Sequence, residues 1–243
     1  MNHLLSEVLK IDTAFVPTNA LNGANTGPYY SLADWRKALF VVEIGAMAAA
    51  ATCALQAMQA TDAAGGGPAK VITGLTDTIT ANTDAEIVTL TLNAVQVADT
   101  VTINGIVFTA AAAADLPNRV FDQSGADADD AASLAAAINH ATAGVPGIVA
   151  TTPGGGVVRL EAAVPGQATV TITAPAATIT PATVRAIGYL EVDAAMLDSA
   201  NGFDHVALRI TNSAGMITSA LLLRGHGRYQ PAEQHVAAAD AAV

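Results

Sequence analysis

Short runs in which apolar and polar residues alternate occur near both ends of the chain and predict β-strands. In residues 40–45 every second side chain is large and apolar, and residues 54–59 resume an alternating pattern after an alanine-rich stretch. A period of two places alternate side chains on one face of a strand. These two runs therefore predict a β-hairpin. Further strand-like runs lie at residues 69–75, 188–193, 203–211 and 219–223.

Residues 39–58 also have the length of a membrane-spanning helix, with Glu43 as their one charged residue. A carboxylate near the middle of such a helix costs about 3 kcal/mol. No aromatic belt or basic flank follows the segment, although membrane helices usually carry them. The alternation therefore favours the hairpin, and we expect no membrane partner.

The middle of the chain, residues 85–177, has a different pattern, with one predicted helix among strands. Residues 101–109 predict a hairpin with Asn104-Gly105 at its tip, a dipeptide that favours tight hairpin turns. Over residues 127–141 apolar side chains recur at helical spacing, and aspartates lie at the N-terminal end, where they complement the helix dipole. Strand-like runs at 87–92, 148–152, 157–162 and 168–173 complete a predicted ββαβββ module.

The two segments that flank the middle region have the same pattern of short alternating strands. Neither segment alone has enough strands to form a sheet with a buried face, so we expect the two to form one domain. The expected fold is mainly β: a discontinuous β-sandwich body with an inserted small α+β module and an extended N-terminal arm. The residue ranges are an arm over 1–30, the body over 31–84 and 178–232, the insert over 85–177, and a C-terminal tail over 233–243. Residues 174–181 predict a stiff linker bracketed by prolines. An ordinary two-domain chain divided near residue 175 is the alternative, but it leaves residues 35–75 as an isolated pair of strands.

The N-terminal segment combines apolar side chains with turn residues. Residues 4–11 predict a short helix, and Asn22-Gly23 and Gly27-Pro28 indicate loops. Solvated tails are usually poor in apolar residues, whereas this segment contains several. We therefore expect an arm that packs on a neighbouring molecule, with its contacts made by Leu4, Leu5, Val8, Phe15 and Val16.

The amino-acid composition restricts the classes of partner that the protein is expected to bind. Charged residues make up 13% of the 243 residues, against roughly 25% in typical soluble domains, which suggests that other subunits cover much of the surface. The net charge of −11 disfavours nucleic acid, whose binding proteins carry basic clusters. Cys53 is the single cysteine, so an intrachain disulfide is impossible, and we interpret it as a buried apolar residue.

Candidate catalytic and metal-binding residues all have simpler structural explanations. Asp122, Asp127, Asp129 and Asp130 lack the spacing of a calcium loop, and the end of the predicted helix explains their charge. The histidines are dispersed, the serines lack a nucleophile-elbow context, and the glycine run at 65–67 precedes no phosphate-loop lysine. Glu43, Glu86, Glu161 and Glu191 leave a glycosidase pair open, but only 4% of residues are aromatic. We expect no enzyme, cofactor or metal.

A few cations lie on or beside the body segments against the acidic background. Arg36, Lys37, Arg209, Arg224 and Arg228 would suit an acidic partner surface if they gather on one face; scattered, solvated strand ends are the alternative. We take Trp35 as the residue that closes one end of the sandwich.

The body segments resemble small virion proteins of tailed bacteriophages. The motifs are Trp-Arg-Lys-Ala-Leu-Phe-Val-Val-Glu-Ile-Gly-Ala (35–46), Ala-Gly-Gly-Gly-Pro-Ala-Lys (64–70), Gly-Phe-Asp-His-Val-Ala-Leu-Arg-Ile-Thr (202–211) and Arg-Gly-His-Gly-Arg-Tyr-Gln-Pro (224–231). The insert, through residues 101–109 and 131–139, is similar to a module that recurs in phage head and tail proteins. The resemblance covers roughly residues 31–231, and its motifs are structural.

This resemblance implies a capsid decoration, or cement, protein on the virion exterior. Such a protein is a β-sandwich that binds the major capsid protein lattice, often as trimers, and stiffens the shell. The expected capsid or subunit contacts are Leu4, Leu5, Val8, Phe15, Val16, Arg36, Lys37, Arg224 and Arg228. A tail-tube, tail-tip or baseplate component is the alternative. A secreted adhesive or carbohydrate-binding module is a further one, which the scarcity of aromatic residues disfavours.

Overall fold

The computed structural model describes residues 8–20, 23–164 and 169–227. These residues form mostly β-strands with one α-helix, which confirms the expected mainly β class. The chain divides into two compact units. The first unit comprises residues 1–44, 53–78 and 188–243, and the second comprises 45–52 and 79–187. From the sequence, the boundaries of the insert were expected after residues 84 and 177.

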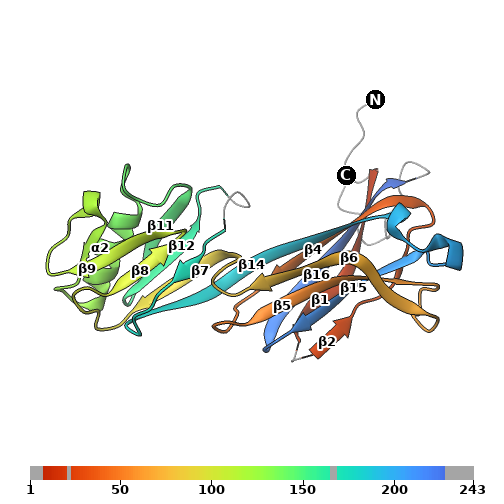
Figure 1. Cartoon of the computed structure of the whole chain (residues 1–243), viewed down its shortest axis with the longest axis horizontal. Helices are drawn as coiled ribbons and strands as arrows, with labels where there is room; N and C mark the ends of the chain where they lie inside the picture. The colour runs from red at the N-terminus through yellow and green to blue at the C-terminus, as the bar shows by residue number, and fades with distance from the viewer. Residues whose placement is uncertain (1–7, 21–22, 165–168, 228–243) are drawn as a thin grey trace, which may run out of the picture. The chain divides into compact units, whose positions relative to one another are not determined.

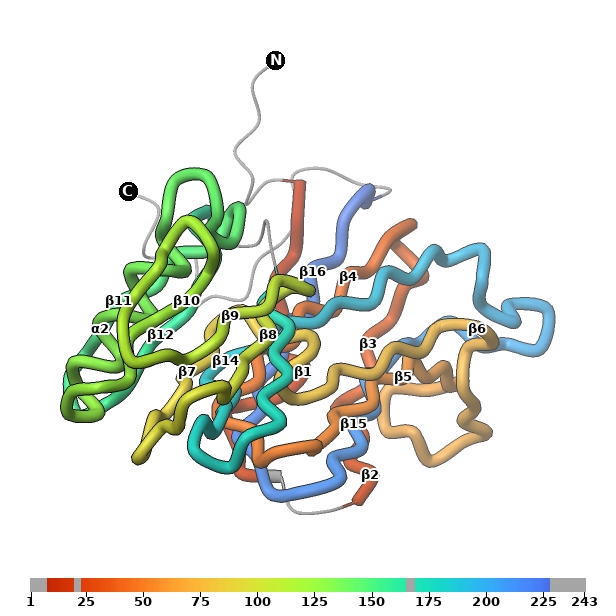
Figure 2. Tube along the Cα trace, turned by 60° about the vertical axis from the view of Figure 1, so that its left-hand side comes forward, coloured from red at the N-terminus to blue at the C-terminus, as the bar shows by residue number. Residues whose placement is uncertain are grey.

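The first unit contains two sheets. The first sheet has the strand order β1-β16-β4-β14, and β16 pairs antiparallel with both β1 and β4; β1 and β16 can be followed side by side in Figure 2. Its strands are β1 (Leu9–Ala20), β16 (Met216–Gly227), β4 (Trp35–Ile44) and β14 (Ile179–Asp193), the last belonging to this unit from Gly188 onward.

The second sheet of the first unit has the order β2-β15-β5-β6, and β3 also pairs with β15. Its strands are β2 (Gly23–Thr26), β3 (Tyr30–Ser31), β5 (Thr52–Ala60), β6 (Ala69–Thr80) and β15 (His205–Asn212). The short 3-10 helices η2 (Ala194–Met196) and η3 (Ser199–Asn201) precede β15. Alternate side chains of these strands are fully buried, as Phe40, Leu55, Leu208 and Leu222 are, and they form a sandwich core.

The second unit consists of one α-helix and two groups of paired strands. One sheet has the order β14-β7-β12-β11, and the other has the order β10-β9-β8-β13. The elements are β7 (Ala85–Leu92), β8 (Thr100–Ile103), β9 (Ile106–Ala111), η1 (Leu116–Asn118), β10 (Val120–Asp122), α2 (Asp127–Ile138), β11 (Ile148–Gly154), β12 (Val157–Ala162) and β13 (Ile172–Thr173). Helix α2 lies against β11 and β12 (Figure 1).

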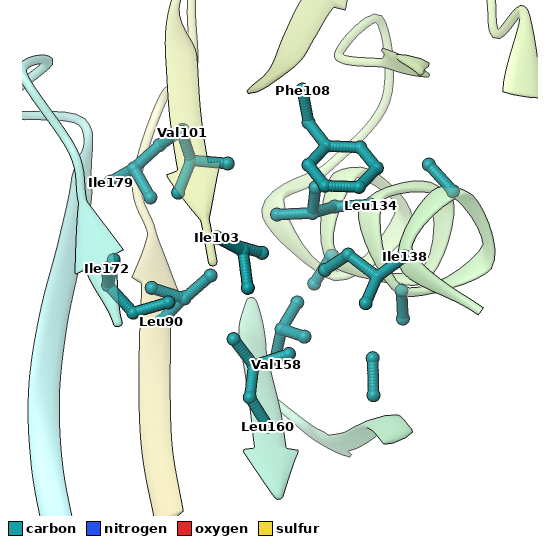
Figure 3. Close-up of a cluster of buried hydrophobic side chains, with 14 of the residues drawn as sticks. Leu90, Val101, Ile103, Phe108, Leu134, Ile138, Val158, Leu160, Ile172 and Ile179 are labelled. Atoms are coloured by element: carbon teal, nitrogen blue, oxygen red, sulfur yellow. The ribbon is translucent and has the colours of Figure 1, made fainter. Parts of the chain in front are cut away.

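Buried side chains from the helix and both sheets meet in the core of the second unit. Leu134 and Ile138 of α2, Phe108 of β9 and Leu160 of β12 belong to one apolar cluster (Figure 3). The predicted helix and the hairpin at Asn104-Gly105 are both confirmed. Asn104 and Gly105 have φ angles of 47° and 79°, the left-handed conformation that a tight hairpin turn needs.

The predicted hairpin of residues 40–59 is wrong in its pairing. Both strands exist, as β4 and β5, but β4 pairs with β16, whereas β5 pairs with β15 in the other sheet. Periodicity specifies which side chains face the core, but it does not specify which strand lies beside which. The alanine-rich stretch therefore connects the two layers of the sandwich.

Three further expectations are corrected. Within the described part of the predicted helix 4–11, residues from Leu9 onward form β1, and β1 pairs with β16 of the same chain instead of leaving as an arm. The predicted linker 174–181 runs into β14, where Ile179, Thr180 and Pro181 pair with β7. The predicted module also lacked β10, which pairs in parallel with β9.

Candidate assembly interface

The side of the first sheet that points away from the sandwich core carries an unusual number of apolar residues. We call it the outer face and define it within the first unit by the outward-pointing residues of four strands. These are Leu9, Ile11, Thr13 and Val16 of β1, Ile217, Ser219, Leu221 and Leu223 of β16, Lys37, Leu39, Val41 and Glu43 of β4, and Tyr189, Glu191 and Asp193 of β14. Tyr189 is 69% exposed, Val16 63%, Ile217 57% and Leu221 47%.

A hollow of about 410 Å³ lies on the outer face where β1 is irregular. The pairing of β1 with β16 shifts register between Thr13 and Phe15 and again between Phe15 and Thr18. Such bulges bend an edge strand and redirect its side chains. The hollow is lined by Thr13, Phe15, Val16, Pro17, Val41, Glu43, Ser219, Ala220 and Leu221. Its walls are mainly apolar, and Thr13, Glu43 and Ser219 are the polar residues among those that line it.

Charged side chains lie at the margin of the outer face. The Nζ atom of Lys37 lies 3.1 Å from a carboxylate oxygen of Glu191 and 3.4 Å from one of Asp193. The hydrogen bonds to Glu191 and then Asp193 raise the pKa of Lys37. The pKa of Asp193 is lowered, first by the backbone N–H of Ala195 and also by Lys37. Glu43 stands at the opposite end of β4. The apolar centre with a charged margin has the anatomy of a protein–protein interface.

A buried ion pair holds β1, and with it the hollow, onto the sheet. Arg224 of β16 donates to the Oδ2 atom of Asp12 from Nε at 2.9 Å and from Nη2 at 2.6 Å, and to the carbonyl oxygen of Ser31 at 2.8 Å. Its guanidinium also lies over the rings of Tyr30 and Trp35. The Tyr30 hydroxyl donates to the Thr13 carbonyl oxygen at 2.6 Å. The pKa of Tyr30 is raised, chiefly by burial and then by Asp12.

The structure brings together only some of the contact residues expected from the sequence. Phe15 and Val16 line the hollow, and Lys37 lies at the margin of the outer face. Arg36 is exposed at the start of β4, and Val8, just before β1, is half-buried. Leu4, Leu5 and Arg228 lie outside the described residues.

Arg224 was also expected to contact a partner, but in this chain its side chain lies inside the first unit. It is only 7% exposed and is bonded to Asp12 within its own unit. Even positions of β16 point inward, so the parity of this strand buries the guanidinium between the sheets. Arg209 of β15 likewise bonds Gln56 of β5. Among the described residues of the first unit, Arg36, Lys37, Arg209 and Arg224 therefore do not gather on one face.

The outer-face residues of β16 and β14 were not among the contacts expected from the sequence, although the sequence of β16 carries a signal. Leu221, Leu222 and Leu223 are consecutive, and Leu39 and Val41 lie between the buried positions of β4. A strand that is apolar at both parities is typical of a sheet covered on both faces. When only the buried, alternate positions of a strand are considered, the apolar residues on its opposite face are overlooked.

The acidic residues around the start of α2 are tied to the backbone. Asp127 accepts a hydrogen bond from the Ala94 N–H at 2.8 Å, Asp129 from the Ala126 N–H at 3.2 Å, and Asp122 from the Ser124 N–H at 2.8 Å. Asp130 is buried, and its Oδ1 atom has no hydrogen-bond partner within residues 8–20, 23–164 and 169–227. Burial raises its pKa. In the described part of the chain, no three acidic, histidine or cysteine side chains are grouped to hold a metal ion.

The candidate glutamates lie in separate ion pairs or at the interface margin. Glu86 accepts from Arg185 and Glu161 from Arg159, both in the second unit, while Glu191 pairs with Lys37 in the first. Cys53 is buried in β5, and burial raises the pKa of its thiol to about 12. Among the described residues, no helix has the length and apolar character needed to cross a membrane.

Comparison with protein families, with curated proteins and with solved structures finds no match to this chain. Its function is therefore inferred from the outer face and from the residues that line it.

Proposed function

We propose that this protein is a structural component of a phage virion that decorates the exterior of the capsid, with the major capsid protein as its partner. The observation that supports this proposal is the outer face, an apolar sheet surface with charges at its margin. Exposed apolar areas of this extent mark interaction sites in soluble proteins. The outer face serves the assembly of the protein within the shell.

The chemistry of the hollow favours assembly over catalysis. A binding pocket for a small molecule needs converging polar groups at defined positions, whereas this hollow lies open on a sheet and its walls are mainly Phe15, Val16, Pro17, Val41 and Leu221. The low fraction of charged residues, 13%, agrees with a protein whose surface is covered by other subunits. The resemblance of the two body segments to phage virion proteins selects the capsid among possible assemblies.

The test is to add the purified protein to capsid shells of the virus that encodes it, assembled without it, and to image the shells by electron cryomicroscopy. We expect regular density on the capsid lattice. Val16→Asp should reduce the occupancy at least tenfold, because it places a carboxylate on the outer face. Val97→Asp is the matched control, since Val97 is 60% exposed in the second unit. Bare shells, or density on tails alone, would contradict the proposal.

A further inference from the structure

The outer face is large enough for an interface of modest size. It spans four neighbouring strands, with seven or eight residues along β1, β16 and β4 and six along β14 within the first unit. At about 4.8 Å between strands and about 3.3 Å per residue, it measures roughly 450 Å² before the relief of the side chains is counted. Each partner of a typical stable complex buries about 800 Å². Exposed side chains such as Tyr189 and Leu221 add relief to the outer face and so increase the area that a partner can bury.

The outer face carries both a protrusion and a hollow. Tyr189 projects from β14 and is 69% exposed, while the hollow of about 410 Å³ lies among β1, β16 and β4. Two different points on one face are always exchanged by some two-fold axis that lies in the plane of that face. Two copies related by this axis place each Tyr189 against the hollow of the other copy, so the same contact forms twice.

The chemistry of the protrusion fits the hollow. A tyrosine has an apolar ring and a hydroxyl at its tip, and buried tyrosines normally find a hydrogen-bond partner. The hollow offers Val16, Pro17 and Leu221 to the ring, and Glu43 and Ser219 as acceptors for the hydroxyl. The contact needs no chemistry that the chain does not itself supply. A tyrosine that is buried in a pocket of the partner is also typical of the residues that dominate binding energy.

We infer that the outer face binds a second copy of this chain, with Tyr189 of each copy inserted into the hollow of the other. The inference rests on the proposal that the outer face is an assembly surface and does not depend on the virion. Because the protrusion and the hollow share one face, the contact closes with two copies. The expected unit of assembly is thus a dimer, not the trimer that the phage resemblance implies.

The first measurement is the mass of the full-length protein in solution, by sedimentation velocity or light scattering over a range of concentrations. We expect a dimer at micromolar concentration. Tyr189→Ser should weaken association about 30-fold, as loss of an aromatic side chain that fills a partner pocket does. Val16→Trp, which fills the hollow, should weaken it similarly, and Val97→Trp in the second unit should not. Circular dichroism of each variant controls for folding.

Mixing two defective variants gives a stricter test. Tyr189→Ser retains the hollow and lacks the protrusion, whereas Val16→Trp retains the protrusion and lacks the hollow. A heterodimer of the two restores one of the two contacts, so it should form more tightly than either homodimer. A general loss of apolar surface or of stability would show no such complementation, and that result would overturn the inference.

Other outcomes are also decisive. A monomeric wild type, or a trimer insensitive to Tyr189→Ser, would overturn the inference. If the wild type is monomeric and the chain ended after Gly227 dimerises, residues 228–243 of the same chain occupy the face, and the inference is wrong. A dimer that does not bind capsid shells would support the inference and contradict the virion proposal. A monomer that binds capsid shells would support the virion proposal and contradict the inference.

Discussion

The outward-pointing rows of the sheets in the two units differ in chemistry, although Val149 of β11, which is 37% exposed, also points outward in the second unit. In the second unit, the row across β7, β12 and β11 contains Thr89, Arg159 and Thr151, and the adjacent positions of β7 and β14 hold Thr91 and Thr180. In the first unit, the row across β4 and β16 pairs Val41 with Leu221, and the next row pairs Leu39 with Leu223. Threonine and charge suit a strand that faces water, whereas leucine and valine suit one that is covered.

The inner sides of the same sheets do not differ in this way. Val88, Leu90, Val158 and Leu160 of the second unit are fully buried beneath α2 and the second sheet of that unit. Phe40, Val42, Ala220 and Leu222 play the same part in the first unit. The contrast between outer faces therefore does not come from a generally apolar chain. It agrees with the proposal that a partner covers the outer face of the first unit.

The largest expected effect concerns the ion pair that fixes β1. Asp12→Ala leaves the guanidinium of Arg224 buried without its carboxylate, and breaking such a pair costs about 3–5 kcal/mol. The first unit should unfold at a lower denaturant concentration, while the transition of the second unit stays unchanged. Lys37→Ala removes an exposed ion pair and should cost less than about 1 kcal/mol. Equal effects of the two changes would show that the buried pair does not hold the edge of the outer face.

Replacing apolar residues by threonine on the outer face of the first unit, and threonine by leucine on the second unit, should move self-association from the first unit to the second. The variant Tyr189→Thr, Ile217→Thr and Leu221→Thr should lose self-association by about two orders of magnitude, with its monomer stability changed by less than about 1.5 kcal/mol. The reverse variant, Thr89→Leu, Thr91→Leu and Thr151→Leu, should begin to associate through the second unit. Sedimentation velocity measures both. An unchanged first variant would mean that the apolar outer face is not an interface.

The single cysteine reports on the first unit alone. The pKa of the Cys53 thiol is raised to about 12 by burial, so at pH 8 its labelling should be about three orders of magnitude slower than in the unfolded chain. Because the folded pKa lies above the unfolded value of about 8.5, the native state retains the proton longer. The free energy of unfolding of the first unit should then fall as the pH rises from about 8.5 toward 12. Labelling by a thiol reagent and denaturant titrations test this, and a wild type labelled as fast as its urea-unfolded form would contradict it.

The smallest effect is expected at Asp130 in the second unit. Burial raises the pKa of this carboxyl, with the nearby aspartates adding to the shift. A raised acid pKa means that the native state binds the proton more tightly, so this group makes the second unit more stable as the pH falls from neutral through that pKa. Asp130→Asn should raise stability at pH 7 and flatten this trend. Denaturant titrations at several pH values measure it, with Asp129→Ala as a control that instead removes the acceptor of the hydrogen bond from the Ala126 N–H.

Local features were predictable from the sequence, and pairing was not. The turn at Asn104-Gly105, helix α2 and the strands β4, β7 and β12 follow from turn chemistry and periodicity. The partner of β4 is β16, far along the chain, and no short-range pattern specifies that choice. The same limit applies to the candidate interface. Val16 and Lys37 were expected as contacts, but Tyr189 and Leu221 lie on the same face only because of the strand pairing, which the sequence does not specify. The burial of Arg224 depends on Asp12, which lies on the opposite end of the sequence.

The pairing of β1 with β16 limits how early the first unit can form during synthesis. On the ribosome, Leu9 of β1 must wait for Gly225 of β16, and at typical synthesis rates of about 5–20 residues per second that delay is roughly 10–40 s. The second unit, whose main segment is continuous from residue 79 to 187, emerges complete before that. The nascent chain therefore holds a finished second unit while β1 and β4 still lack β16. In this interval the apolar strands of the first unit are open to chaperones and to neighbouring nascent chains, and translation speed becomes a determinant of yield.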